Sequence, residues 1–306
     1  MKPYYQDDQV TLLLGDAKQE AVNLQPASIQ TIITSPPYFG LRDYGISNQI
    51  GAEKTPRDFI NNLVAVFQAL RPALKEDGVL WVNLGDSYAK TQSNNGGYSK
   101  SSRLAGFTSA NTKARIANES GKRWKIDAGR PNKSLLGIPW QFAFAMQDAG
   151  WLLRNDIIWH KQNRMPESVT DRFSVKHEHI FMFTKHASYK FYLDAVREPH
   201  LTCEIYEGRN EDGKNAGDVW TLNSTPFPGA HFATFPRELP RRCIQAGCRP
   251  GGVVLDPFSG SGTTGEQALL LGRRYIGIDV NSDYHDLALG TRLAQQTLAW
   301  ESGGAA

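Results

Sequence analysis

The sequence predicts an α/β fold with a mostly parallel β-sheet and helices on both of its faces. Short apolar segments alternate with amphipathic segments of helical period along most of the 306 residues, which is typical of strands joined by helices. Polar residues also follow the ends of several apolar segments: Asp16, Ser35, Asp86, Asp256 and Asp279. Because the carboxyl ends of parallel strands lie at one edge of a sheet, we expect these residues to form one composite site.

The first half of the chain contains three short apolar segments, which we predict as strands at 11–15, 28–34 and 79–84. Residues 57–73 place apolar side chains at helical spacing, so we expect a helix there. The pair Asp77-Gly78 predicts a turn between that helix and the next strand. A second helix is expected over 138–149, because a proline stands near its start and a glycine follows its end.

The second half continues the alternation without an internal repeat. Its apolar segments predict strands at 151–160, 180–184, 253–255 and 275–280. Its amphipathic segments predict helices at 236–246, 263–271 and 282–296. Residues 186–235 are rich in proline, glycine and aromatic residues and show little periodicity, so no regular element is predicted there.

Composition excludes several classes of protein. The hydrophobic content of 40% is ample for a core, and no run of eighteen apolar residues is present, so we expect neither disorder nor a membrane span. The polar N-terminus does not have the pattern of a signal peptide. Three cysteines (Cys203, Cys243 and Cys248) have no metal-ligand spacing and form no even disulfide set. We therefore expect a cytoplasmic protein without a metal site. We also expect residues 1–306 to form one domain.

A glycine-rich segment near the C-terminus has the features of a nucleoside-cofactor site. It reads Asp256-Pro-Phe258-Ser-Gly260-Ser-Gly262-Thr263-Thr264 and follows the predicted strand 253–255. The two glycines allow the backbone to approach a ligand closely, and either threonine has a side chain that can cap the following helix. Nineteen residues after Gly260, Asp279 ends the next strand, where a carboxylate can accept hydrogen bonds from both hydroxyls of a ribose.

A second motif near the N-terminus suits a planar base with an exocyclic amine. It reads Thr34-Ser35-Pro36-Pro37-Tyr38 and follows the predicted strand 28–34. The hydroxyl of Ser35 and the carbonyl of Pro36 can accept hydrogen bonds from an amino group, and two prolines fix the turn that presents them. Tyr38 can stack on a base that has rotated out of a helix.

Together the two motifs resemble the DNA amino-methyltransferases that use S-adenosylmethionine. The target-base motif precedes the cofactor motif, which resembles the permuted order of the β class of that family. The resemblance implies the Rossmann-like class I methyltransferase fold, with S-adenosylmethionine as cofactor and duplex DNA as substrate. It covers most of the chain, since the segments 151–161, 165–168 and 177–178 are also similar to family segments.

The resemblance also implies roles for individual residues. Asp16 corresponds to the position that contacts the cofactor's adenine, and the segment 231–236 to the position near its methionine end. The implied catalytic residues are Ser35, Pro36, Pro37 and Tyr38. The implied cofactor-binding residues are Asp16, Thr34, His231, Thr234, Phe235, Asp256, Phe258, Gly260, Gly262, Thr263, Thr264 and Asp279. His177, Asp156, Trp159 and Lys161 are open to either a functional or a purely structural interpretation.

The residue at position 35 bears on the target base. Enzymes of this family that act on adenine N6 commonly carry Asp or Asn there, whereas Ser-Pro-Pro-Tyr is more typical of cytosine-N4 enzymes. We therefore favour cytosine N4 and keep adenine N6 as the alternative. Methylation at cytosine C5 is excluded, since it needs a cysteine nucleophile, typically in a Pro-Cys dipeptide, and no cysteine here follows a proline.

Charge is unevenly distributed along the chain. Residues 87–134 contain ten basic and two acidic residues, a local charge of +8 within a chain of net charge +3. This stretch is either a solvated surface insertion or a flexible basic arm that neutralises DNA phosphates, and the base-binding motif favours the arm. The irregular region 186–230 is the candidate target-recognition region.

Several points stay open at this stage. The substrate could be structured RNA, since the chemistry at the base is the same, and a catalytically idle DNA-binding module with this fold is a further alternative. The recognised sequence cannot be read from the chain. The sequence also leaves open whether the protein forms a homodimer and whether it has a partner restriction endonuclease.

Overall fold

The computed structural model of the chain describes residues 2–40, 49–89, 129–164, 167–200, 211–223 and 235–293. Its contacts divide the chain into two compact units. The first unit comprises residues 1–36, 60–85 and 138–306, and the second unit comprises residues 37–59 and 86–137. Each unit is described by itself below.

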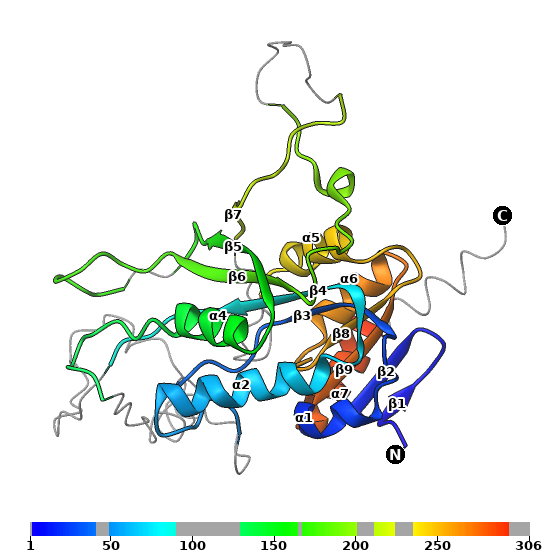
Figure 1. Ribbon diagram of the computed structural model, residues 1–306, viewed down its shortest axis with the longest axis horizontal. Coiled ribbons are helices and arrows are strands. Elements are labelled where there is room, and N and C mark those ends of the chain that lie inside the picture. The colour runs from blue at the N-terminus through cyan, green and yellow to red at the C-terminus, as the bar shows by residue number, and fades with distance from the viewer. Residues whose placement is uncertain are drawn as a thin grey trace, which may run out of the picture. The chain divides into compact units, whose positions relative to one another are not determined.

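The first unit contains a single β-sheet, which in the described residues has nine strands (Figure 1). In spatial order the strands are β1 (Tyr5–Gln6), β2 (Val10–Leu14), β9 (Arg274–Asp279), β8 (Val253–Asp256), β3 (Ile29–Thr34), β4 (Leu74–Leu84), β6 (His177–Thr184), β5 (Leu152–His160) and β7 (Val219–Thr221). The pairs β2–β9, β9–β8, β8–β3, β3–β4 and β5–β7 are parallel. The pairs β1–β2, β4–β6 and β6–β5 are antiparallel. The predicted α/β fold with a mostly parallel sheet is therefore confirmed.

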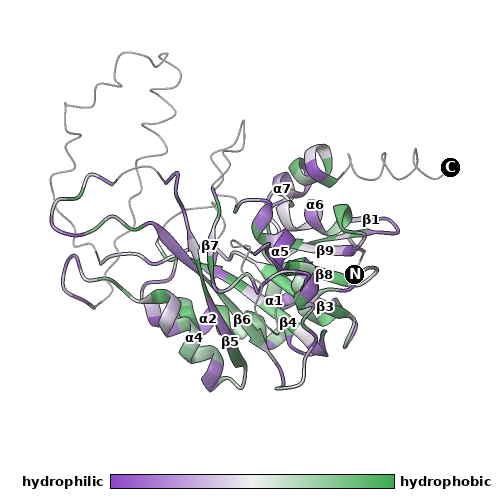
Figure 2. Cartoon of the chain, turned by 90° about the horizontal axis from the view of Figure 1, so that it is seen from above, coloured by the Kyte–Doolittle hydropathy of each residue, from purple (hydrophilic) through white to green (hydrophobic). Residues whose placement is uncertain are grey.

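Helices cover both faces of this sheet, as predicted. One face carries α5 (Glu238–Gly247), α6 (Thr263–Leu270) and α7 (Ser282–Ala288). Leu239, Ile244 and Leu269 of these helices join Ile33 and Trp81 of the sheet in one core cluster. Figure 2 shows hydrophobic colour along the central strands β3, β4 and β6.

The opposite face is covered by α2 (Pro56–Leu70), whose residues from Ile60 onward belong to the first unit, and by α4 (Ile138–Asp148) (Figure 1). The aromatic rings of Phe67, Phe142 and Phe183 link α2, α4 and β6 edge to face. Their ring centroids are 5.7 and 6.0 Å apart, within the range of favourable aromatic pairs.

Two details differ from the predictions. The turn expected at Asp77-Gly78 is a bulge inside β4, where register with β3 shifts between Ile29 and Thr31. Gly78 allows this because a Cβ there would lie 2.9 Å from the carbonyl oxygen of Gln30. The helix predicted at 282–296 is α-helical only to Ala288 and continues as a π-helical turn over Leu289–Leu293.

Short elements were not predicted. These are β1, β7, α1 (Ala17–Glu20) and the 3₁₀ turns Ala21–Asn23 and Leu193–Val196. Each spans at most four residues, which is too short for a periodic pattern to be recognised.

The second unit is described at 37–40, 49–59, 86–89 and 129–137. The amide of Gly40 donates to the carbonyl of Gly51, and the rings of Phe39 and Phe59 lie 5.6 Å apart. The amide of Gly137 donates to Asp86. Asp86 therefore fixes a loop within this unit.

None of the described helices is both long and apolar enough to cross a lipid bilayer.

Candidate active site

The carboxylate of Asp256 joins two of the predicted motifs. The hydroxyl of Thr34 donates to its Oδ1 and the hydroxyl of Thr264 to its Oδ2, each over 2.6 Å. The amide of Phe258 also donates to Oδ1, over 3.1 Å. All of these side chains except that of Phe258 are fully buried, and burial raises the pKa of Asp256 to about 6. Asp256 thus holds the end of β3 against the start of α6.

The glycine turn follows β8 with the backbone that the motif predicts. Gly260 and Gly262 have φ angles of +49° and +78°, in the left-handed region that glycine adopts without strain. A Cβ on Gly260 would meet nothing closer than 4.0 Å, whereas one on Gly262 would lie 2.9 Å from the Cβ of Ala288. The space over Gly260 is open to a ligand, while Gly262 is needed for packing against α7.

The predicted capping role of the threonines is wrong. Gly262 is the N-cap of α6, and Thr263 and Thr264 lie inside the first turn. Thr264 cannot cap because its hydroxyl is bonded to Asp256. Its role is to fix the carboxylate below the turn.

Asp279 lies at the end of β9, beside the glycine turn. Its Oδ2 accepts the amide of Gly260 over 2.8 Å and its Oδ1 the amide of Asn281 over 3.0 Å. Burial raises the pKa of this carboxyl. The amide of Gly15 donates to the carbonyl of Asp279, and the next residue, Asp16, caps α1. The ends of β2, β8 and β9 therefore meet around Asp279, as the fold rule predicts.

A polar chain leads away from Ser35. The amide nitrogen of Asn83 donates to the Ser35 hydroxyl over 3.3 Å and to Glu178 Oε2 over 3.0 Å. The ammonium of Lys161 donates to Glu178 Oε1 and lies 3.8 Å from the ring centroid of Trp159. Burial lowers the pKa of Lys161, and the Glu178 carboxylate opposes that shift.

Asn83 was not predicted as a site residue, because an asparagine inside a hydrophobic strand carries no motif. The available signal was its position one residue before the end of the predicted strand 79–84, since strand ends carry the other site residues. The antiparallel pairing of β6 with β4 places Glu178 at the same edge.

A second pair lies on the neighbouring strands. Nδ1 of His179 contacts Asp156 Oδ1 at 2.9 Å, and its ring packs on Phe181 and against the edge of Trp140. Burial lowers the pKa of the nearby His177. These contacts account for Asp156 as a partner of a buried histidine, which favours its structural interpretation.

Of the other predicted residues, two belong to the second unit, one packs against the core of the first unit, and two lie outside the described residues. Pro37 and Tyr38 belong to the second unit, where the carbonyl of Tyr38 lies close to Gly51. Phe235 packs partly buried against the core cluster. His231 and Thr234 lie outside the described residues, as do most of the basic stretch 87–134 and parts of the region 186–230.

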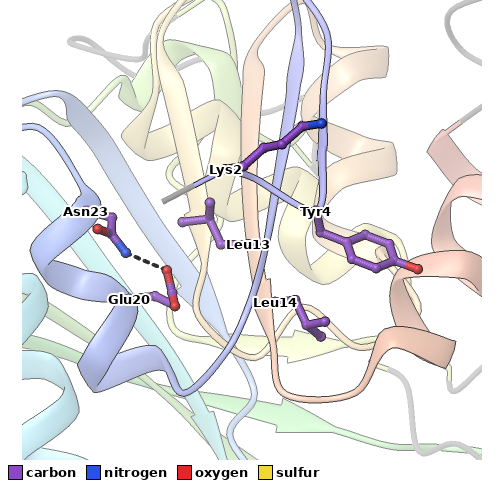
Figure 3. Close-up of a pocket in the computed structure, with 6 residues that line it drawn as sticks. All are labelled: Lys2, Tyr4, Leu13, Leu14, Glu20 and Asn23. Atoms are coloured by element: carbon purple, nitrogen blue, oxygen red, sulfur yellow. Dashed lines mark hydrogen bonds between the residues drawn. The ribbon is translucent and has the colours of Figure 1, made fainter.

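A separate pocket of about 230 Å³ lies beside β2 and α1 (Figure 3). It is lined by Lys2, Tyr4, Leu13, Leu14, Glu20 and Asn23. None of the predicted site residues lines it.

The fold is that of a class I methyltransferase. The family model for DNA methylases of the N6/N4 type matches residues 29–290. The chain belongs to this family, and it is a site-specific DNA methyltransferase that uses S-adenosylmethionine.

Two relatives and two solved structures illustrate the similarity. The type II methyltransferase M.Cfr9I of Citrobacter freundii is 44% identical over 287 residues, which cover 94% of this chain and 89% of the relative. M.SmaI of Serratia marcescens is 43% identical over 283 residues, covering 90% and 88%. The PvuII DNA methyltransferase (cytosine-N4-specific) superposes with a TM-score of 0.66 at 18% identity, covering 98% of this chain and 94% of that structure. A putative DNA modification methylase from Thermus thermophilus, solved in complex with S-adenosyl-L-methionine, superposes with a TM-score of 0.57 at 22% identity, covering 94% and 95%.

These comparisons confirm the predicted family, fold and cofactor, and DNA as the substrate.

Proposed function

We propose that the protein transfers a methyl group from S-adenosylmethionine to the exocyclic N4 amine of a cytosine extruded from duplex DNA. The observation that carries this choice of base is Ser35, which follows β3 in a Ser-Pro-Pro-Tyr turn and is held by Asn83. The structural neighbour named as cytosine-N4-specific has the same fold. Adenine N6 is the alternative target.

The residues at the strand ends fit the cofactor. The open space over Gly260 admits a ligand close to the backbone. Asp279 has lone pairs beyond those used by two amides and is suited to ribose hydroxyls. The proposed cofactor-binding set is that predicted from the sequence, with Asp256, Thr34 and Thr264 acting by fixing the turn. When bound, S-adenosylmethionine supplies an electrophilic methyl group.

The chain's own residues prepare the amine. The lone pair of an exocyclic amine is delocalised into the ring, so the nitrogen must become more tetrahedral to react. The Ser35 hydroxyl and the Pro36 carbonyl accept its hydrogens and favour that geometry, and Tyr38 stacks on the base. Catalysis then comes from positioning and electrostatics, without a covalent enzyme intermediate.

The remaining expectations are part of the same proposal. Both units form one catalytic domain over 1–306, the stretch 87–134 binds phosphates, and the region 186–230 reads the target sequence. The protein acts in the cytoplasm.

The test uses purified protein, mixed-sequence duplex DNA and labelled S-adenosylmethionine, followed by digestion and mass spectrometry of the nucleosides. N4-methylcytosine is expected. N6-methyladenine would support the mechanism but show that the target is adenine N6. Methylation of RNA but not DNA would contradict the proposal that DNA is the substrate. If the protein neither formed a methylated product nor bound the cofactor, it would not be a methyltransferase.

A further inference from the structure

The loop between β5 and β6 carries the most exposed large hydrophobic side chain among the described residues. Phe173 is 98% exposed. A single exposed apolar side chain is ordinary on a protein surface. The structure describes residues 161–164 and 167–176 of this loop. Three features of the loop distinguish Phe173 from an ordinary exposed apolar residue.

The first feature is position. β6 runs antiparallel to β4, and β5 runs antiparallel to β6, so β5 runs in the same direction as β3 and β4. The loop that follows β5 therefore leaves the sheet at the edge where Ser35 follows β3. Figure 1 shows the hairpin extending past the neighbouring strands at that edge (green, at the left).

The second feature is a chain of contacts from the base of the loop to the catalytic motif. Lys161, the first residue of the loop, binds Glu178, which accepts from Asn83. Asn83 in turn donates to Ser35. The base of the loop is thus fixed relative to Ser35 within the first unit.

The third feature is bracing and charge at the tip. Glu167 accepts from both Arg164 and Arg172, over 3.1 and 2.8 Å. Arg172 also donates to the carbonyl of Phe173, over 3.0 Å. The backbone at Phe173 is therefore held by side chains. Residues 161–176 include four basic and two acidic residues, which suits a surface that faces phosphates.

We propose that Phe173 is a wedge that inserts into the DNA duplex at the target and stabilises the extruded base. Apolar side chains inserted between base steps unstack them, and an aromatic ring stacks on any base. An extruded base leaves a gap in the stack, and an aromatic ring carried on a braced backbone at the same edge as Ser35 fills it. The inference rests on the proposed extrusion of the target base.

The test compares the parent with Phe173→Ala, Phe173→Trp and Val22→Ala, whose side chain is also exposed (85%) but lies in the turn after α1. The recognition sequence is first read from the positions methylated in plasmid DNA. Each protein then methylates a fully paired duplex and a duplex with an abasic residue opposite the target, which lowers the work of extrusion. The readouts are kcat/KM, melting temperature, cofactor affinity and sedimentation.

On the paired duplex, Phe173→Ala should lower kcat/KM by about ten- to a hundredfold, the effect of losing one base–aromatic stack. On the abasic duplex it should regain activity to within about threefold of the parent, because little unpairing remains. Phe173→Trp should stay within about threefold on both duplexes, since it keeps the stacking surface. Melting temperature and cofactor affinity should not change, and Val22→Ala should match the parent throughout.

An equal loss for Phe173→Ala on both duplexes, or no loss on either, would overturn the wedge. So would a parent dimer that Phe173→Ala dissociates, because Phe173 would then contact a second copy of the chain. In each of these cases a parent that methylates DNA leaves the proposed function intact. A parent that methylates neither duplex would overturn both.

Discussion

The amide of Asn83 donates a hydrogen bond to the hydroxyl oxygen of Ser35, with 3.3 Å between the two atoms. The same nitrogen donates to Glu178, so the amide is held in one orientation. Ser35 keeps its own proton and a second lone pair for the target base. Asn83 is therefore a positioning residue for the group that accepts from the amine.

Asn83→Leu should lower kcat by about ten- to a hundredfold, which corresponds to the loss of a buried hydrogen bond of ~1.5–3 kcal/mol. The KM for S-adenosylmethionine should change little, because Asn83 is on β4, which is separated by β3 from β8 and the glycine turn that follows it. Steady-state kinetics separate the two parameters. The control is Thr31→Val, which removes a buried hydrogen bond to the Val79 carbonyl elsewhere in the sheet. Equal effects of the two variants on kcat would show that Asn83 acts only through stability.

The ion pair between Lys161 and Glu178 predicts a non-additive effect on stability. Both side chains are nearly buried, at 12% and 11% exposure. Glu178→Gln should reduce the free energy of unfolding by about 3–5 kcal/mol, because it leaves a buried ammonium without its charge partner. The double variant Glu178→Gln with Lys161→Met should recover a large part of that loss. Urea denaturation of the parent, of Glu178→Gln, of Lys161→Met and of the double variant measures the coupling. Strict additivity would show that the two charges do not interact.

Because the pKa of Asp256 is raised, the stability of the cofactor-free protein should depend on pH. Burial raises its pKa from 3.8 to about 6, so between these values the folded protein binds more protons than the unfolded chain. The free energy of unfolding should therefore fall as the pH rises from about 4 to about 6, by about 3 kcal/mol. The difference between the parent and Asp256→Asn in urea denaturation isolates this contribution. A parent that gains stability relative to the variant across this range would mean that Thr34 and Thr264 stabilise the anion.

Residues of the candidate site that belong to sequence motifs could be predicted, whereas residues and contacts that depend on tertiary structure could not. The motif residues Thr34, Asp256 and Asp279 could be predicted because each follows an apolar segment, and parallel strand ends converge. The hydrogen bonds among them could not, since the capping role expected for Thr264 competes with a buried carboxylate that only the tertiary structure places beside it. Asn83 was missed because its contacts are 48 and 95 residues away in sequence.

The fold shows the same limit. Long amphipathic segments such as α2 and α4 were predicted because periodicity identifies them. The direction of β6 was not, because a fully apolar strand has the same pattern in parallel and antiparallel pairs. The bulge in β4 was missed because Asp77-Gly78 is a turn signal that tertiary pairing overrides.

Replacing either glycine of the glycine turn by alanine should destabilise the protein, and the loss of unfolding free energy should differ between the two positions. Gly260→Ala should lower the free energy of unfolding by about 1–2 kcal/mol, the strain of a left-handed alanine. Gly262→Ala should cost about 1–3 kcal/mol more, because its Cβ would lie 2.9 Å from that of Ala288. Gly260→Ala should also weaken S-adenosylmethionine binding measured by calorimetry. Gly272→Ala, with φ +68° and no neighbour within 4 Å, is the matched control and should leave binding unchanged. If both alanines weaken binding equally, Gly260 does not approach the cofactor.

The basic stretch 87–134 predicts a salt dependence of DNA binding. Each phosphate that a basic residue neutralises contributes about −0.9 to the slope of log K against log salt concentration. Replacing Lys122, Arg123 and Lys125 by glutamine should therefore make the slope less negative by up to about 2.7 and weaken binding evenly across sequences. Fluorescence anisotropy at several salt concentrations measures the slope. Lys18→Gln, an exposed change in α1, serves as control. An unchanged slope would favour the alternative that this stretch is a solvated surface insertion, because such an insertion releases no counterions from DNA.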